Sequence, residues 1–209
     1  MPPYEAVLNS LRFAVAATVL AVVVGLTAAA VVAYVGGRVG RAYDLLLMLP
    51  LGASAVTIGF GFLVALDRPV DLRRSLLLVP IAHALVAVPF VVRSTLPVMR
   101  AVRRHLREAA LVLGAGPLRA WREVDLPLTY RAILVGAAFA FAVSVGEFGA
   151  TTFLALPTAP TLPIAVFRLL SQPGAATFGQ AMALSVVLMA LVATAVLVIE
   201  SLRTGGEEL

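Results

Sequence analysis

Five long apolar runs are the feature that most constrains what this sequence can fold into. They cover residues 13–35, 45–66, 75–92, 132 to about 156, and 181–199. A helix rises about 1.5 Å per residue, so roughly 20 apolar residues cross the hydrocarbon core of a bilayer. A lipid-exposed backbone must satisfy its own hydrogen bonds, which favours helices, and the runs lack the alternation of barrel strands. They predict an all-α membrane protein with about five transmembrane helices.

The composition agrees with a membrane solvent. Of the 209 residues, 61% are hydrophobic and 13% are charged, whereas soluble domains carry about 25% charged residues. The chain has no cysteine, so disulfides and thiol chemistry are excluded. His83 and His105 are far apart in the sequence, and we therefore expect no metal site and no cofactor bound directly by this chain. The net charge of +5 comes with arginines confined to the gaps between apolar runs, a pattern that favours membrane lipid over nucleic acid.

The arginines also predict an orientation. The first loop, the third loop and the C-terminus carry ten arginines: Arg38, Arg41, Arg100, Arg103, Arg104, Arg107, Arg119, Arg122, Arg131 and Arg203. The opposite side carries five: Arg12, Arg68, Arg73, Arg74 and Arg168. Because cytoplasmic loops are richer in arginine, we expect the N-terminus outside and the C-terminus in the cytoplasm. The expected parts are an external segment 1–12, a transmembrane domain 13–203 with a cytoplasmic loop at about 100–127, and a tail 204–209. An N-terminus that starts outside without a leader suggests a further helix upstream or one half of a longer protein.

The third loop reads as two short helices joined by a tight corner. Glu108 lies near the start of the first helix, where the helix dipole favours a carboxylate. Gly114 suits the left-handed residue that ends a helix, and Pro117 suits the first turn of the next. A small apolar surface framed by charged residues fits docking into a partner protein, or an amphipathic helix pair lying on anionic lipid. The residues alone leave both interpretations open.

The spacing in this loop resembles the EAA motif of type I ABC importer permeases. The matching positions are Glu108-Ala109-Ala110, Gly114 and Val124-Asp125-Leu126-Pro127, with Val124 where the family more often has isoleucine. The resemblance implies a coupling helix between helices 3 and 4 that sits in a cleft of a cytoplasmic ATPase. The residues expected to make this contact are Glu108, Ala109, Ala110, Leu113, Gly114, Leu126 and Pro127.

The same resemblance implies the rest of a transport system. The chain itself would not be an enzyme, because a separate ATPase dimer would use ATP and Mg, and no Gly-x-x-x-x-Gly-Lys phosphate loop is present. An extracytoplasmic substrate-binding protein and a second permease half are the other expected partners. The expected location is the bacterial inner membrane, crossed several times, and the expected mechanism is alternating access.

The substrate expectation comes from other resembling stretches. The string Gly146-Glu147-Phe148-Gly149-Ala150-Thr151 resembles permeases for molybdate, sulfate, ferric iron and thiamine. Residues 161–170 and 66–73 resemble the thiamine and ferric-iron branch, and in particular the C-terminal half of its fused permeases. We therefore expect thiamine or ferric iron as cargo, with an oxyanion such as molybdate or sulfate as the alternative.

Glu147 has two possible roles at the end of the fourth run. A carboxylate within a membrane helix costs about 2.5–3.5 kcal/mol on insertion scales, so it usually faces a cavity or a partner. It either lies beside the pathway or lies near the outer interface, where it caps or pairs. The candidate pathway residues are Ser144, Glu147, Phe148, Gly149, Thr151 and Thr152.

Two other classes of protein stay open. A proton-coupled secondary transporter could use Glu147, although such proteins usually show several buried charges. A membrane-embedded hydrolase would need His83 paired with Ser54 or Ser144, but the Gly-x-Ser-x-Gly context is absent. Residues 157–179 are too short to span and contain an amphipathic piece, 164–170. We expect this segment to rest on the outer face, either touching the binding protein or packing as a loop.

Overall fold

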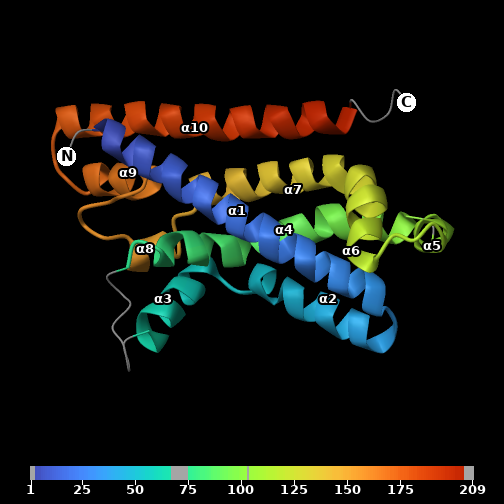
Figure 1. The fold of residues 1–209 in the computed structure, drawn as a ribbon. Helices are drawn as coiled ribbons and strands as arrows, with labels where there is room; N and C mark the ends of the chain where they lie inside the picture. Colours follow the sequence, from blue (N-terminus) through green and yellow to red (C-terminus); the bar gives the residue numbers. More distant parts are fainter. Residues whose placement is uncertain (1–2, 67–74, 103, 205–209) are drawn as a thin grey trace.

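The computed structural model describes residues 3–66, 75–102 and 104–204, and within these ranges the chain is all-helical (Figure 1). The expected all-α fold is confirmed. The elements are α1 Pro3–Val35, α2 Gly37–Gly52, α3 Ala55–Ala65, α4 Leu78–Ala101, α5 Arg104–Val112, α6 Pro117–Ala120, the π-helix η1 Trp121–Asp125, α7 Leu126–Gly146, α8 Thr151–Leu154, α9 Leu162–Leu170 and α10 Ala175–Thr204. Arg103 lies outside the described residues. So does most of the stretch 66–73, on which part of the cargo expectation rests.

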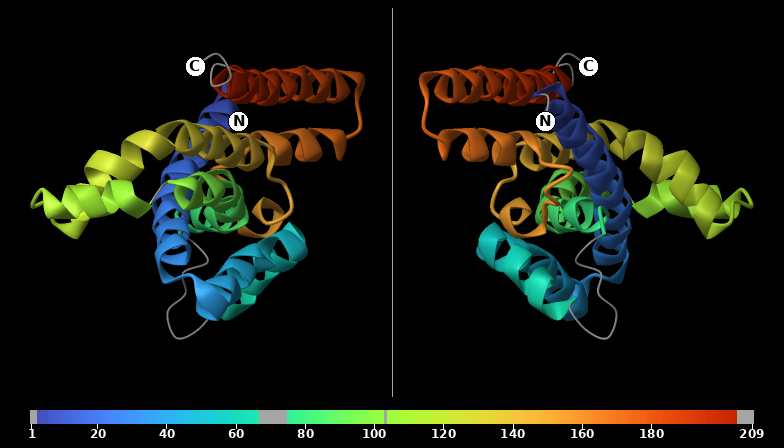
Figure 2. Two further views of the ribbon diagram at one scale, coloured as in Figure 1. Left: turned by 90° about the vertical axis from the view of Figure 1, so that its right-hand side faces the viewer. Right: turned by 90° about the vertical axis from the view of Figure 1, so that its left-hand side faces the viewer.

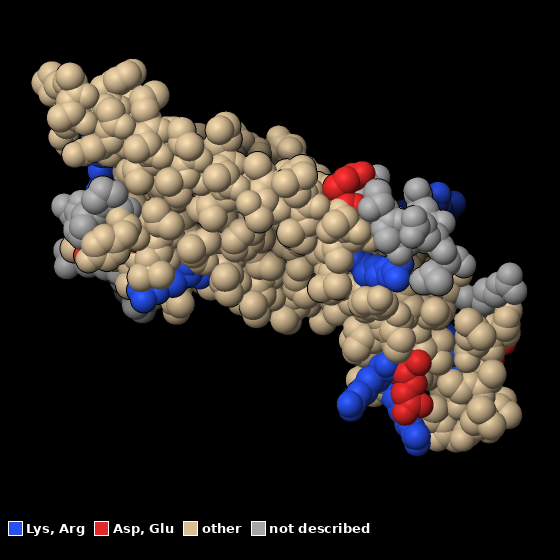
Figure 3. Space-filling model, turned by 90° about the horizontal axis from the view of Figure 1, so that it is seen from above, with Lys and Arg blue, Asp and Glu red and all other residues tan. Residues whose placement is uncertain are grey.

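Among the described residues, four helices are long and apolar enough to cross a membrane. They are α1, α4, the continuous helix Pro117–Gly146 and α10, and α2 with α3 makes a fifth span if this bent pair counts as one. About five spans are thereby confirmed. In Figure 3 the long middle of the visible face shows no charged side chains, which gather toward the two ends. A bilayer requires this distribution of charge.

The bounds of the predicted spans differ from those of the helices, most of all in the second and fourth spans. The run 45–66 is not one straight helix, because α2 and α3 meet at 97°. Pro50 has no N–H to donate, and Ala53 is extended with φ −93° and ψ 143°, so the helix ends there. The fourth span ends at Gly146 rather than near residue 156, since Glu147 is extended with φ −71° and ψ 121°. The expected external segment 1–12 continues α1 as helix from Pro3.

The core lies where α1 and α7 pack on α4. Val91 of α4 is fully buried between glycines of its two neighbours. A Cβ on Gly25 of α1 would lie 2.8 Å from the Cβ of Val91, and a Cβ on Gly136 of α7 would lie 3.1 Å from its Cα. Small residues allow membrane helices to approach this closely. The two glycines therefore bring α1 and α7 close to α4 on either side of Val91.

The two ends of the molecule hold different parts. The start of α1, α9 and the start of α10 lie at one end, whereas the α1–α2 turn, α5, α6 and the end of α10 lie at the other (Figures 1 and 2). The first loop, the third loop and the end of α10 thus share one end, as the arginine distribution requires. Which end faces the cytoplasm stays a prediction.

Candidate functional site

The loop between α4 and α7 has the predicted two-helix corner. Gly114 has φ +86°, the left-handed conformation that glycine adopts most readily. The Ala115 amide donates to the Ala110 carbonyl at 3.0 Å and closes the end of α5. Gly116 then precedes α6, whose first residue is Pro117. From Pro117 the helix continues through η1 into α7, so the corner connects directly to a spanning helix.

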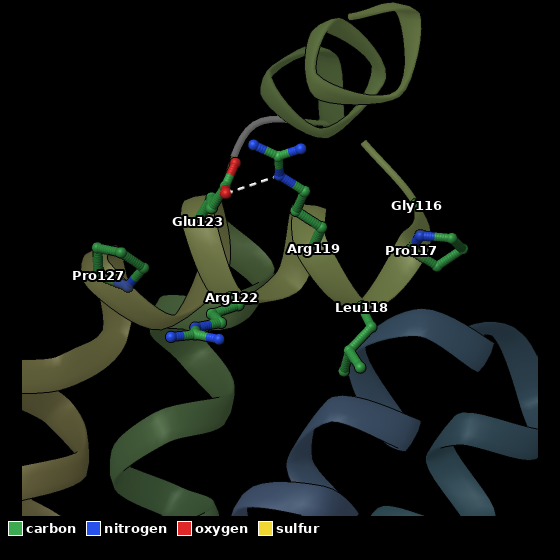
Figure 4. A pocket seen from close by; sticks show the side chains of 7 residues that line it. All are labelled: Gly116, Pro117, Leu118, Arg119, Arg122, Glu123 and Pro127. Carbon is green, nitrogen blue, oxygen red and sulfur yellow. Dashed lines mark hydrogen bonds and ion pairs between the residues drawn. The ribbon is translucent and has the colours of Figure 1, made fainter. Parts of the chain in front are cut away.

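This loop carries an exposed apolar surface. Val112 is 87% exposed, Leu113 is 88% exposed and Leu118 is 78% exposed. Leu118 and Pro117 line a groove together with the charged side chains of Arg119, Arg122 and Glu123 (Figure 4). There Arg119 donates from Nε to Glu123 Oε1 at 2.8 Å. Apolar side chains exposed beside charges are typical of a surface that binds another protein.

The structure places the predicted coupling residues on this surface in two groups. Glu108, Ala109, Leu113 and Gly114 are exposed, and Ala110 is half-buried, all on α5 or just after it. Leu126 and Pro127 lie at the other end of the loop, at the start of α7, where Pro127 is exposed. Their contact with an ATPase stays a prediction.

Sequence reasoning missed a buried cluster beneath the loop. Asp125, which is 1% exposed, accepts from Arg107 Nε at Oδ1 and from the Tyr34 hydroxyl at Oδ2, both at 2.7 Å. The Arg107 guanidinium also lies 4.7 Å from the centre of the Tyr34 ring. The hydrogen bond to Asp125 raises the pKa of Arg107 above its ordinary value, so the guanidinium stays charged. Tyr34 and Asp125 are 91 residues apart, and only the folded corner brings them together.

A second buried cluster surrounds Glu147 at the far end of α7. Its Oε1 accepts from the Ala150 amide at 2.9 Å. Its Oε2 accepts from the Thr151 amide at 3.0 Å and from the Thr151 hydroxyl at 2.7 Å, and lies 3.3 Å from His83 Nε2. His83 also lies 2.8 Å from Ser144 Oγ through Nδ1 and 2.6 Å from Thr151 Oγ1 through Nε2. The carboxylate therefore caps α8 and pairs with a histidine of α4.

The structure thus joins three of the six pathway candidates, Ser144, Glu147 and Thr151, around His83. The other three lie outside this cluster. Phe148 packs on Phe167 with ring centres 5.4 Å apart, Thr152 is exposed, and a Cβ on Gly149 would lie 3.0 Å from the Val56 amide of α3. The lining of a pathway by any of the six stays a prediction.

The pair considered for a membrane-embedded hydrolase does form. His83 and Ser144 are in hydrogen-bond contact, with Glu147 on the other ring nitrogen. Their exposed fractions are 1% for His83 and 3% for Ser144. A nucleophilic hydroxyl must reach its substrate, and this one is enclosed by its own chain. The arrangement fits a structural hydrogen-bond network better than a hydrolytic site.

Comparison with known proteins gives a family match over most of the chain. The sequence model of the family described as "Binding-protein-dependent transport system inner membrane component" matches residues 21–204. The molybdenum transport system permease protein ModB of Mycobacterium tuberculosis is 33% identical over 207 residues, covering 92% of this chain and 76% of that protein. ModB of Escherichia coli (strain K12) is 32% identical, covering 83% of this chain and 82% of that protein. A putative 2-aminoethylphosphonate transport system permease protein, PhnV of Salmonella typhimurium, is 29% identical, covering 90% and 70%.

We predict that Glu147→Gln destabilises the protein. The amide nitrogen of glutamine would face a donor from Ala150 or Thr151, leaving a buried donor unsatisfied at a cost of about 1–3 kcal/mol. The apparent melting temperature of the detergent-solubilised protein should fall by several degrees. Glu123→Gln is the matched control, because that side chain is 55% exposed and should leave the melting temperature unchanged. Equal melting temperatures for both variants would contradict the capping role.

Proposed function

We propose that this chain, which belongs to the family of binding-protein-dependent transport system inner membrane components, imports an oxyanion such as molybdate as the permease subunit of an ABC transporter. Membership confirms the resemblance expected from the loop spacing. The expected thiamine or ferric-iron cargo finds no support, because the similar permeases are named for molybdenum and for 2-aminoethylphosphonate. That expectation rested on short stretches around residues 66–73 and 161–170, which weigh less than identity over 83–92% of the chain. The molybdenum permeases favour the alternative cargo, an oxyanion.

The surface of the loop carries the proposal that an ATPase docks there. Val112, Leu113 and Leu118 are the exposed apolar side chains, and they lie on a corner fixed by Gly114 and Pro117. A rigid corner with an apolar tip fits into a groove of a folded partner. The partner is a cytoplasmic subunit that binds and hydrolyses ATP with Mg, so this chain contributes no catalytic residue.

The remaining parts follow from the ends of the molecule. The end with α5 and α6 faces the cytoplasm, and the end with α9 faces outward. The exposed Phe167 of α9 lies on the surface that contacts the substrate-binding protein. A second permease half completes the pathway. ATP binding brings the two ATPase subunits together, the docked loops move with them, and the spanning helices open the pathway outward; hydrolysis resets it.

We predict that Gly114→Val releases the ATPase. Valine is strained at φ +86° by about 1–3 kcal/mol, which distorts the end of α5. The amount of ATPase that co-purifies with the membrane-inserted chain should fall at least about fivefold. Glu108→Lys, which reverses a charge on the same helix, should act in the same direction.

Gly116→Val is the matched control. Both glycines have open space where a Cβ would lie, but Gly116 has φ −68° and ψ 165°, which valine adopts without strain. The amount of ATPase that co-purifies with Gly116→Val should stay within about twofold of that with the unmodified chain. Equal retention by Gly114→Val and Gly116→Val would contradict docking through this corner, and would favour a loop that lies on lipid.

The cargo is tested by uptake. The chain, its second half, the ATPase and the binding protein are reconstituted in liposomes and supplied with molybdate, 2-aminoethylphosphonate, thiamine or ferric iron. We expect ATP-dependent uptake of molybdate to exceed that of the other three. Faster uptake of thiamine or ferric iron would overturn the oxyanion proposal and leave the docking proposal standing.

A further inference from the structure

An ion pair between a buried carboxylate and a half-buried guanidinium joins the docking loop to the spanning helices. Arg107 of α5 binds Asp125, the last residue of η1, through Nε at 2.7 Å and also through Nη2. The same Nη2 donates to the Met99 carbonyl near the end of α4 at 3.1 Å. Tyr34, in the last turn of α1, donates its hydroxyl to the second oxygen of Asp125. One carboxylate and one guanidinium thus connect α1, α4, α5 and η1.

The burial of this pair makes it difficult to separate. The Asp125 side chain is 2% exposed and the Arg107 side chain is 20% exposed. A buried carboxylate without its cation is strongly unfavourable, so any movement of α5 must carry Asp125 with it or break the pair. A second ion pair of the loop, Arg119 with Glu123, differs in its exposure. Its side chains are 69% and 55% exposed, and both residues lie on the α6–η1 stretch. Such an exposed pair constrains the loop little.

Asp125 occupies the joint between the loop and α7. It ends the five-residue π-helix, and the next residue, Leu126, begins α7. Its carbonyl accepts from the Thr129 hydroxyl at 2.7 Å, which holds the first turn of α7 to the joint. Single π-helical turns inside α-helices are frequent at functional positions. The Asp125 side chain thereby links the docking helix to the point where α7 enters the membrane.

We propose that Arg107, Asp125 and Tyr34 form a brace that makes the docking loop move as one body with the inner ends of α1, α4 and α7. The brace rests on the proposed function, because it passes the motion of a docked ATPase to the membrane helices. Arg107 and Asp125 are positioning residues that act through these helices rather than on ATP or cargo. Loss of the brace separates two processes that are normally linked, ATP hydrolysis and transport.

The test is Asp125→Asn in the complete reconstituted transporter. Asparagine keeps the shape of the side chain and removes the charge that holds Arg107. We expect molybdate uptake per ATP hydrolysed to fall at least tenfold, whereas the ATPase retained on the complex stays within twofold. A side chain with a merely structural role would lower both quantities together.

Two milder variants grade the effect and stand in if Asp125→Asn does not fold. Arg107→Lys keeps the charge, but one ammonium cannot replace the fork that reaches both Asp125 and the Met99 carbonyl, so its uptake per ATP should be intermediate. Tyr34→Phe keeps the ring beneath the guanidinium and loses one hydrogen bond, so we expect a two- to threefold loss. Glu200→Gln removes a carboxylate from α10 at the same end of the molecule and is the control, with unchanged uptake per ATP.

The outcomes separate the brace from the function on which it rests. Unchanged uptake per ATP in Asp125→Asn, or in both milder variants if it does not fold, overturns the brace. Loss of the ATPase from Asp125→Asn also overturns it, since the residue would then serve docking. If the unmodified complex retains no ATPase, the proposed function itself fails. If it hydrolyses ATP without molybdate uptake, only the cargo proposal fails. The variants are then compared by the labelling of Thr152→Cys with a thiol reagent, with and without ATP. The unmodified brace should give a labelling rate that depends on ATP, and the brace variants should lose this dependence.

Discussion

Close packing of two helices against α4 is the constraint on which the rest of the structure depends. In lipid there is no hydrophobic driving force for helix association, so the helices gain van der Waals contacts by approaching closely. Gly25 and Gly136 provide this approach on either side of Val91, and the alanines beside them are fully buried. The three-helix core leaves large apolar side chains on the outside, where lipid or a partner covers them. α10 packs on α7 and runs the length of the molecule, whereas the shorter helices lie toward its two ends (Figure 1).

The two buried polar clusters are held by the same pair of helices. α4 carries His83 near its start and the Met99 carbonyl near its end, roughly 24 Å apart at 1.5 Å per residue. α7 begins after Asp125 and reaches Ser144 in its last turn. Each cluster ties α4 to the start or the end of α7, and each is satisfied by hydrogen bonds. Since the helices between them are closely packed, a displacement at the loop is expected to reach the other end rather than dissipate within the core.

The sequence predicted what depends on local chemistry. The apolar runs indicated the spans, and Gly114 with Pro117 indicated the corner, because a left-handed glycine and a helix-starting proline are recognisable without a fold. The sequence did not predict that α2 and α3 meet at 97°, although Pro50 marked the region, since a proline can kink a membrane helix or end it. It also did not predict the partners of Asp125 and Glu147. Tyr34 and His83 lie on other helices, and a single sequence carries no signal for which side chains meet across a core.

Crosslinking tests the central claim, that an ATPase drives this permease through the loop, most directly. The chain has no cysteine, so Leu113→Cys introduces a single thiol at a position that is 88% exposed. A short bifunctional reagent should join it to the ATPase subunit in native membranes. Tyr4→Cys, which is 67% exposed at the opposite end, should give no such product. An ATPase crosslink from Tyr4→Cys and none from Leu113→Cys would contradict the account.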